Sequence, residues 1–542
     1  MVHAVSRVFN VTSYSLTRST RGGMSRDENA LPCDRTSALS HVHRDSRLLV
    51  AMSIDLTLDR IRTLSLHLPP YTRPTCHIVG TNGKGSVSAL LSSMLFASTP
   101  PLSVGRFNSP HLVSIYDCIV INGENVMPDA YASARAEVER VEKKYDTGAS
   151  SFELLTLTAL MIFEHAKLDI VIIEAGMGGR LDATNIIPDE AIVVSALTAV
   201  DLDHQAFLGD TVHAIAQTKA GIARIGRPFV VGAQTHPEVE ESVKTVIAAR
   251  GGDMGWALRV VARAWDPLID GPEPLPVSLS ASGFQAPSSQ PVEISIPCFS
   301  ETVRALLPLH GNHQLDNLGL ASSVISTLLT HPSCTHLNLR GRITPDSVTR
   351  GIKATKWLGR LSFHTLTLRP SLESETTFEC SPLTVLADGA HNPASSTTLA
   401  NYITHLLSLV THAKVAPRSI SLTYILALSH SPPKTPLQTL TPLLPPTIPP
   451  YLTVSVNVGL VRFTPPEGMP WVKSVAPSEL REVVRSIAPG VDVWAVGDEE
   501  QEQEQLPRAF EWATVKSGTE GLIILGGSLY LVADFYRMLR GY

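Results

Sequence analysis

The sequence predicts an α/β protein made of two units. The first is an N-terminal P-loop-type ATPase domain with a mostly parallel sheet, and the second is a smaller, Rossmann-like α/β domain. Three observations support this fold class. Unbroken apolar runs typical of buried parallel strands alternate with helical segments. A glycine-rich loop joins the first such strand to a helix, and acidic residues directly follow two later strands, Glu174 and Asp388.

Length and composition limit the class of protein. A chain of 542 residues is long for one core, so we expect two domains with additional segments. The net charge of −6 gives no basic footprint for nucleic acid, and no apolar run approaches the ~18 residues that a membrane helix needs. The six cysteines are scattered without a C-x-x-C pair, which favours reduced thiols and a cytoplasmic location.

The first 51 residues differ in composition from the rest of the chain. Arginines alternate with Ser and Thr, and no acidic residue precedes Asp27. This pattern is typical of a mitochondrial targeting segment, and a disordered extension or an unused upstream start is the alternative. We therefore assign residues 1–51 to an N-terminal extension, 52–355 to the ATP-binding domain and 356–542 to the C-terminal domain.

Residues 76–86 form the clearest local pattern. An apolar strand leads through Gly80, Gly83 and Gly85 into a helix whose apolar residues recur with helical spacing, at Val87, Leu90, Leu91, Met94 and Leu95. Free N–H groups at a helix start bind anions, Lys84 could reach a phosphate, and the Ser86 hydroxyl could join a Mg²⁺ shell. The usual motif has Gly where Ile78 stands and no residue between Lys84 and Ser86, so an ordinary turn with a solvated lysine is the alternative.

Further polar residues stand where strands end. Glu174 follows the buried strand 170–173 and is a candidate Mg²⁺ ligand, or else an acid bonded to its own loop. His204 follows the strand at 192–194 and is a second candidate ligand, although a lone histidine is more often structural. Ser109 precedes a proline turn and could offer its hydroxyl to a metal or cap the turn. Lys219 lies on a helix, where a solvated charge is the simplest interpretation.

The second half of the chain predicts a second sheet. Residues 251–300 are rich in Pro, Ser and Gly and are expected to be an excursion, and regular patterning returns with a helix that begins near residue 313. The proline-rich stretch 432–450 is expected to form a surface excursion. Buried strands are expected at residues 383–387, 422–428, 454–458, 491–496 and 522–525.

Together these loops resemble the Mur ligase superfamily and, within it, the folylpolyglutamate synthase and dihydrofolate synthase family. The resemblance covers about residues 52–542. The matching pieces stand in the family's order: GTNGKGS at 80–86, SPHL at 109–112, EAGMGGRLDATN at 174–185, Asp203-His204, KAGI at 219–222, GRL at 359–361 and DGAHN at 388–392.

The resemblance implies an ATP-dependent amide ligase that phosphorylates a carboxylate and transfers the acyl group to the amine of L-glutamate. By the same resemblance, Lys84, Lys219 and His391 serve catalysis, and Lys219 can be carbamylated. One or two Mg²⁺ ions, and optionally a monovalent cation, accompany ATP; the metal residues are Ser86, Ser109, Glu174 and His204. ATP is contacted by Gly80, Thr81, Asn82, Gly83, Lys84, Gly85, Ser86, Asn317, Arg360 and Asp388.

The resemblance also bears on the substrate. Polyglutamate-extending members usually carry an arginine-rich run after the SPHL motif, whereas residues 113–123 read VSIYDCIVING. Residues 462–471 and 526–531 resemble fungal dihydrofolate synthases. We therefore favour dihydropteroate as acceptor, with extension of a reduced folate, or both activities, as the alternative. A non-catalytic nucleotide-binding protein is a further alternative, against which the retained Lys84, Glu174, His204 and Lys219 argue. The family implies a monomer with small-molecule partners, and neither nucleic acid nor a membrane.

Overall fold

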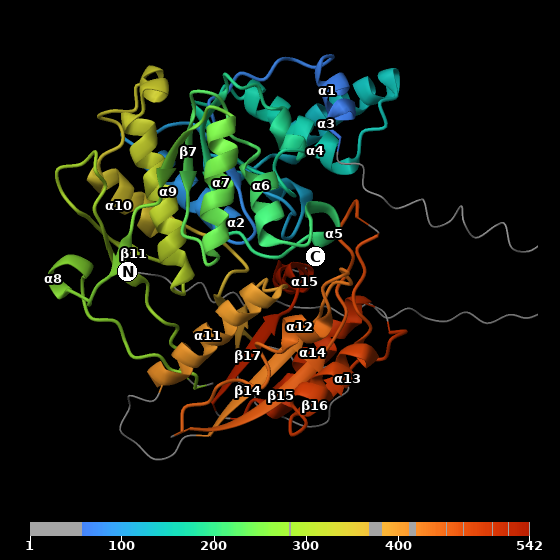
Figure 1. The fold of residues 1–542 in the computed structure, drawn as a ribbon. Helices are drawn as coiled ribbons and strands as arrows, with labels where there is room; N and C mark the ends of the chain where they lie inside the picture. Colours follow the sequence, from blue (N-terminus) through green and yellow to red (C-terminus); the bar gives the residue numbers. More distant parts are fainter. Residues whose placement is uncertain are drawn as a thin grey trace, which may run out of the picture.

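The computed structural model describes residues 57–280, 283–367, 382–410, 419–450, 452–469, 471–500, 502–518 and 520–540. The N-terminal extension predicted at residues 1–51 lies outside these ranges. Figure 1 shows two layered units, one built from the blue-to-yellow part of the chain and the other from the orange and red part. The predicted fold class is confirmed, since each unit holds its own mostly parallel sheet between helices.

The first unit is organised around an eight-stranded sheet. Its strand order is β4-β3-β2-β5-β1-β6-β7-β8, and all neighbours from β2 to β8 run parallel. Because β1 lies between β5 and β6, the loops after these three strands meet at one edge of the sheet. The strands are β1 Thr75–Val79, β2 Val104–Phe107, β3 Ile119–Ile121, β4 Glu124–Asn125, β5 Ile170–Glu174, β6 Ile192–Leu197, β7 Pro228–Val231 and β8 Asp253–Trp256.

Helices cover both faces of this sheet. Along β1, Cys76 and Ile78 face one apolar cluster and Val79 faces another, as the alternation of a strand requires. The first cluster lies under α2 Lys84–Phe96, α9 His313–Thr330 and α10 Pro345–Ala354. The opposite face is covered by α1 Asp59–Ser65, α3 Pro128–Tyr145, α4 Ser151–His165, α6 Val212–Ala220 and α7 Pro237–Ala249.

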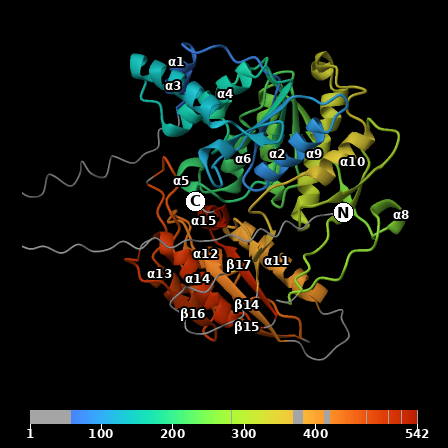
Figure 2. The ribbon, with the colours of Figure 1, turned by 180° about the vertical axis from the view of Figure 1, so that it is seen from behind.

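The second unit contains the five strands predicted in the second half of the chain. Its sheet has the order β12-β13-β17-β14-β15-β16, parallel except for the edge strand β12. Figure 2 shows its helices flanking the sheet. The strands are β12 Ser362–Leu366, β13 Leu383–Ala387, β14 Ser419–Leu426, β15 Thr453–Leu460, β16 Asp492–Ala495 and β17 Gly521–Gly526; the helices are α11 Pro393–Val410, α12 Pro436–Leu440, α13 Pro477–Ile487, α14 Glu502–Lys516 and α15 Leu529–Arg540.

Two segments differ from expectation. The proline-rich stretch 432–450 was expected at the surface, which is wrong for three of its four leucines: Leu440, Leu443 and Leu444 are fully buried in the second unit's core. The expectation failed because prolines punctuate this backbone without preventing the leucines between them from packing.

The excursion at 251–300 holds β8 and part of a small sheet formed by β9 Val260–Ala262, β10 Gln290–Ile294 and β11 Val303–Leu307. Between β9 and β10 the chain crosses to the second unit. There Leu279 is 2% exposed in that unit's core, and its carbonyl accepts the N–H of Gly521 at 3.2 Å.

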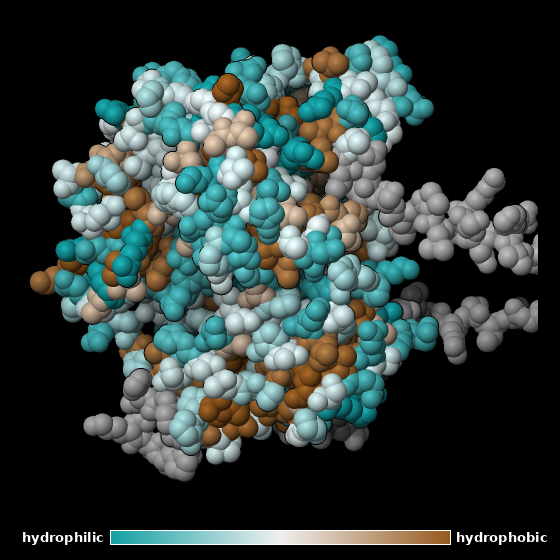
Figure 3. Space-filling model, in the orientation of Figure 1, coloured by the Kyte–Doolittle hydropathy of each residue, from teal (hydrophilic) through white to brown (hydrophobic). Residues whose placement is uncertain are grey.

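The outer surface is mixed in character. Figure 3 shows apolar side chains standing out at the edge formed by α8 Pro267–Asp270, where Leu268 is 97% exposed. Within the described ranges, no helix combines the length and apolar character that a membrane span requires.

Candidate active site

A cavity of about 630 Å³ lies where the two units meet. Its wall comes from the loops after β1, β2, β5 and β6 and the start of α9, and, on the other side, from residues 356–361 and the segment after β13. The sequence-predicted site residues come together here. Those bordering the cavity are Gly80, Thr81, Asn82, Gly83, Lys84, Gly85, Ser86, Ser109, Glu174, His204, Lys219, Asn317, Arg360, Asp388 and His391.

The glycine loop is shaped by close contacts. Gly80 has φ +151°, and a Cβ at this position would lie 1.8 Å from the Thr198 hydroxyl oxygen. Gly83 has φ +93°, and a Cβ there would lie 2.3 Å from Asn317 Oδ1. Gly83 is also the N-cap of α2, which has no side-chain cap and no acidic residue in its first turn. The start of α2 therefore offers N–H groups and positive dipole to an anion.

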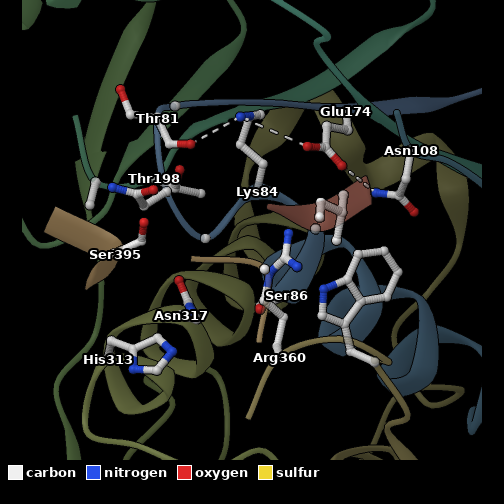
Figure 4. Close-up of a pocket in the computed structure, with 18 of the residues that line it drawn as sticks. Thr81, Lys84, Ser86, Asn108, Glu174, Thr198, His313, Asn317, Arg360 and Ser395 are labelled. Carbon is white, nitrogen blue, oxygen red and sulfur yellow. Dashed lines mark hydrogen bonds and ion pairs between the residues drawn. The ribbon is translucent and has the colours of Figure 1, made fainter. Parts of the chain in front are cut away.

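Lys84 links this loop to the end of β5. Its ammonium donates to the Thr81 carbonyl at 3.1 Å and lies 3.8 Å from Glu174 Oε1, as Figure 4 shows. The other Glu174 oxygen accepts the Asn108 amide at 2.6 Å. Burial raises the pKa of Glu174, and the charge of Lys84 opposes that shift. A cation and an acid are thus held beside a helix N-terminus, an arrangement suited to phosphate and a divalent metal.

Ser86, Asn108 and Glu174 bring hard oxygen atoms to the wall of the same cavity. The buried Ser86 hydroxyl accepts a hydrogen bond from Gln314 at 3.3 Å, and Asn108 Oδ1 is buried without a hydrogen-bond partner. Within the described ranges, no group of three His, Cys, Asp or Glu side chains could by itself hold a metal. The donor set therefore fits Mg²⁺, which takes one or two carboxylates and completes its shell with phosphate oxygens and water.

Lys219 and His204 border the cavity near the same loop. Lys219 is 3% exposed, and its ammonium donates to the Gly80 carbonyl at 2.8 Å. Burial, reinforced by the charge of Lys84, lowers the pKa of Lys219 to about 7. His204 caps the short helix α5 Gln205–Leu208, and the protein packed around its imidazole lowers its pKa to about 4. At neutral pH, His204 therefore keeps a free ring lone pair for a ligand.

On the second unit's side, Asp388 shapes the wall. One carboxylate oxygen accepts the Leu361 N–H at 2.8 Å and the other accepts the Ala390 N–H at 2.9 Å. Burial raises the pKa of Asp388, and the charge of Arg360 opposes the shift. Asp388 therefore fixes two backbone segments of this wall, one next to Arg360 and the other next to His391.

A polar cluster joins the two units beside the cavity. Asp203 Oδ2 lies 3.5 Å from His391 Nε2 and accepts the Asn392 amide at 3.4 Å, while Asp203 Oδ1 lies 3.9 Å from the Lys434 ammonium. Burial acts to raise the pKa of Asp203, but its bond with His391 and the surrounding positive charges hold that pKa well below its usual range. The first unit's acid is thus held by three groups of the second.

Comparison with known proteins places this geometry in a family. The family model described as dihydrofolate synthetase, C-terminal domain, matches residues 372–538. The dihydrofolate synthetase of Saccharomyces cerevisiae is 31% identical over 489 residues, covering 90% of this chain and 98% of that protein. The chain belongs to the dihydrofolate synthetase family. A probable dihydrofolate synthetase of Schizosaccharomyces pombe is 28% identical, with 90% of this chain and 99% of that protein covered.

Solved structures share the fold. The folylpolyglutamate synthase of Mycobacterium tuberculosis, complexed with ADP and AMPPCP, has a TM-score of 0.66 at 24% identity and covers 92% of this chain and 98% of its own. An E. coli FolC protein in complex with DHPP and ADP has a TM-score of 0.64 at 22% identity and covers 91% and 95%. The family resemblance inferred from the motifs is therefore confirmed, and this chain is an ATP-dependent ligase.

Further residues at this cavity were given no role by sequence reasoning. Asn108 bonds Glu174, Gln314 bonds Ser86, and Thr198 limits the space at Gly80. Trp357 packs on the loop, since a Cβ at Gly85 would lie 2.3 Å from its ring. In the sequence, Asn108 directly precedes the SPHL motif and Gln314 stands three residues before Asn317, and these positions were the only indication of a role. His111, in the SPHL motif, is buried at 3% exposure and does not border the cavity.

Proposed function

We propose that this ligase joins L-glutamate to 7,8-dihydropteroate and forms dihydrofolate, while ATP is converted to ADP and phosphate. The observation that carries the choice of acceptor is the loop that follows Ser109 on the cavity wall. Residues 113–123 contain no lysine or arginine, and the Asp117 carboxylate is taken by three backbone N–H groups of the same loop. Such a wall suits an acceptor without a polyanionic tail.

The proposed chemistry has two balanced steps. A carboxylate oxygen of the acceptor attacks the γ-phosphorus of ATP, and the bond from that phosphorus to the β–γ bridging oxygen breaks. The products are an acyl phosphate and ADP, which is the leaving group. The amine of L-glutamate then attacks the acyl carbon, phosphate departs and the amine nitrogen loses a proton. Lys84 and the uncapped start of α2 hold the β- and γ-phosphates, because they supply positive charge where negative charge gathers. Asn317, Arg360 and Asp388 are proposed to contact the rest of ATP.

Ser86, Ser109 and Glu174 would hold one Mg²⁺ ion, and Glu174 with His204 would hold a second; bound metal would neutralise the charge of the reacting anions. Carbamylation of Lys219 requires its neutral amine, and a pKa of about 7 makes that neutral form available near neutral pH. His391 borders the cavity from the second unit and is proposed to act near the reacting centre. The monovalent cation remains a prediction.

Both units wall the cavity, so closure would exclude water and protect the acyl phosphate from hydrolysis. We further propose that the chain acts as a monomer in the cytoplasm. Mitochondrial targeting by residues 1–51 remains a prediction about a segment outside the described ranges.

The test uses the purified protein with Mg-ATP, L-glutamate and either dihydropteroate or tetrahydrofolate. ADP release and the mass of the product are measured for each acceptor. We expect ADP release that requires both glutamate and dihydropteroate, and a product heavier by one glutamyl residue. Turnover with tetrahydrofolate but not with dihydropteroate would instead indicate a folylpolyglutamate synthase. Nucleotide binding without acceptor-dependent turnover would favour the non-catalytic alternative.

A further inference from the structure

The loop that carries Ser109 belongs to the first unit but its tip is embedded in the second. Val113 is 7% exposed and packs in the apolar cluster formed under α14 and α15. Leu112 lies against the start of the second unit, because a Cβ at Gly359 would lie 3.6 Å from Leu112 Cδ1. Both residues also border the cavity. This part of the wall therefore depends on how the second unit is docked.

The tip of the loop is cross-linked by one carboxylate. Asp117 Oδ1 accepts the Leu112 N–H at 2.8 Å, and Asp117 Oδ2 accepts the N–H groups of Val113 and Ser114 at 2.7 and 3.0 Å. A carboxylate that binds three consecutive amides fixes their spacing. Val113 is thus fixed relative to Leu112 and Ser114, and only residues 110–111 separate this fixed tip from Ser109.

Arg537 applies such a restraint from the last helix, α15. Its Nε donates to the Val113 carbonyl at 3.2 Å, and its Nη1 donates to Asp534 Oδ1 at 2.7 Å. The other Asp534 oxygen accepts the Thr464 N–H at 2.8 Å. The guanidinium therefore bridges the units, because it bonds Asp534 of the second unit and the Val113 carbonyl in the first unit's loop.

The other end of this loop meets the proposed metal site. Asn108, which directly precedes Ser109, donates to Glu174 at 2.6 Å. We propose that Arg537 is a positioning residue that couples docking of the C-terminal helix to the placement of Ser109 and of the acceptor wall. This role rests on the proposed function, because it concerns the metal and acceptor sides of that same cavity.

The test compares Arg537→Gln and Arg537→Lys with a matched control, Arg485→Gln. Arg485 also pairs with an acid three residues away, Glu482 at 3.3 Å, but this pair is exposed on α13 and does not bridge the units. Hydrogen exchange of residues 109–118 is measured in each protein, together with KM for acceptor and for ATP and the half-saturating Mg²⁺ concentration.

We expect Arg537→Gln to speed exchange at Leu112, Val113 and Ser114 about tenfold, through loss of one charge-assisted hydrogen bond. The acceptor KM and the Mg²⁺ requirement should rise about threefold to tenfold, with the ATP KM unchanged. Arg537→Lys should recover part of both effects, and Arg485→Gln should show neither.

Wild-type exchange and kinetics in Arg537→Gln would overturn the inference. A fall in thermal stability with kcat lowered but both the acceptor KM and the Mg²⁺ requirement unchanged would also overturn it, because it would indicate a purely structural role. If the wild-type protein turns over neither acceptor, the proposed function fails instead, and the exchange measurement still decides whether Arg537 restrains the loop.

Discussion

Replacing Lys219 by methionine is expected to stabilise the folded protein at pH 6. Burial and the charge of Lys84 lower the pKa of Lys219 from 10.5 to about 7. Holding its ammonium in the folded protein therefore costs on the order of 5 kcal/mol at a pH below 7. Methionine has a similar shape and no charge, but it loses the bond to the Gly80 carbonyl, worth about 1–3 kcal/mol. The net gain at pH 6 should be a few kcal/mol.

The sign of the pH dependence follows from proton linkage. Below about pH 7 both the folded and the unfolded states carry the proton, so the cost of the buried charge is complete. Between about pH 7 and pH 10.5 only the unfolded state binds the proton, so the stability of the wild-type protein relative to the variant rises with pH. Near pH 10 the wild-type protein should equal or exceed the variant.

The assay is urea unfolding of the metal-free proteins at pH 6 and pH 9.5, with midpoints compared rather than absolute free energies, because two units need not unfold together. Lys244→Met, at an exposed position on α7, is the control and should change neither midpoint appreciably. The reasoning is refuted if Lys219→Met is less stable than the wild-type protein by the same amount at both pH values.

Three further changes test other parts of the molecule. Lys84→Ala should lower ADP release about 10²–10³-fold or more with an unchanged circular dichroism spectrum, and near-normal turnover would contradict its phosphate role. Gly83→Ala should lower the free energy of unfolding in urea by about 1–3 kcal/mol and reduce the extra stability that bound ATP gives the protein. Gly123→Ala, at φ +87° but in open space, should leave the stabilisation by ATP unchanged. Leu444→Ala should cost about 2–5 kcal/mol, against about 0.5 kcal/mol or less for the half-exposed Leu437→Ala; equal losses would contradict its place in the core.

The sheets and the edge on which the site lies could be predicted because their signals are local. The strand before Glu174 is an unbroken apolar run, and parallel strands place their following loops at one edge. That rule brings Lys84 and Glu174 together although they stand 90 positions apart in the sequence. The tight glycine turns were also local, since Gly83 occupies a backbone conformation that other residues rarely adopt.

The remaining contacts depend on side-chain packing between distant segments, which no local pattern specifies. Asn108 could be expected to bond its own turn, yet it bonds Glu174 at the end of the neighbouring strand β5. Val113 follows a polar motif and precedes Ser114, so nothing nearby marks it as part of the second unit's core. The leucines at 440–444 were hidden by flanking prolines. These contacts form only when segments far apart in the sequence have packed together in the folded protein.

The crossing of Leu279 changes how the cavity can open to release product. The chain passes from the first unit to the second through residues 355–361, and Leu279, on the connection between β9 and β10, also lies in the second unit's core. A swing about the covalent joint alone must therefore either withdraw that leucine, at about 1.5–3 kcal/mol for its exposure, or carry residues 277–280 along and draw slack from the chain on both sides. Val113 and the Asp203 cluster also bridge the units, so opening the cavity has to break, or carry along, contacts that lie away from the covalent joint.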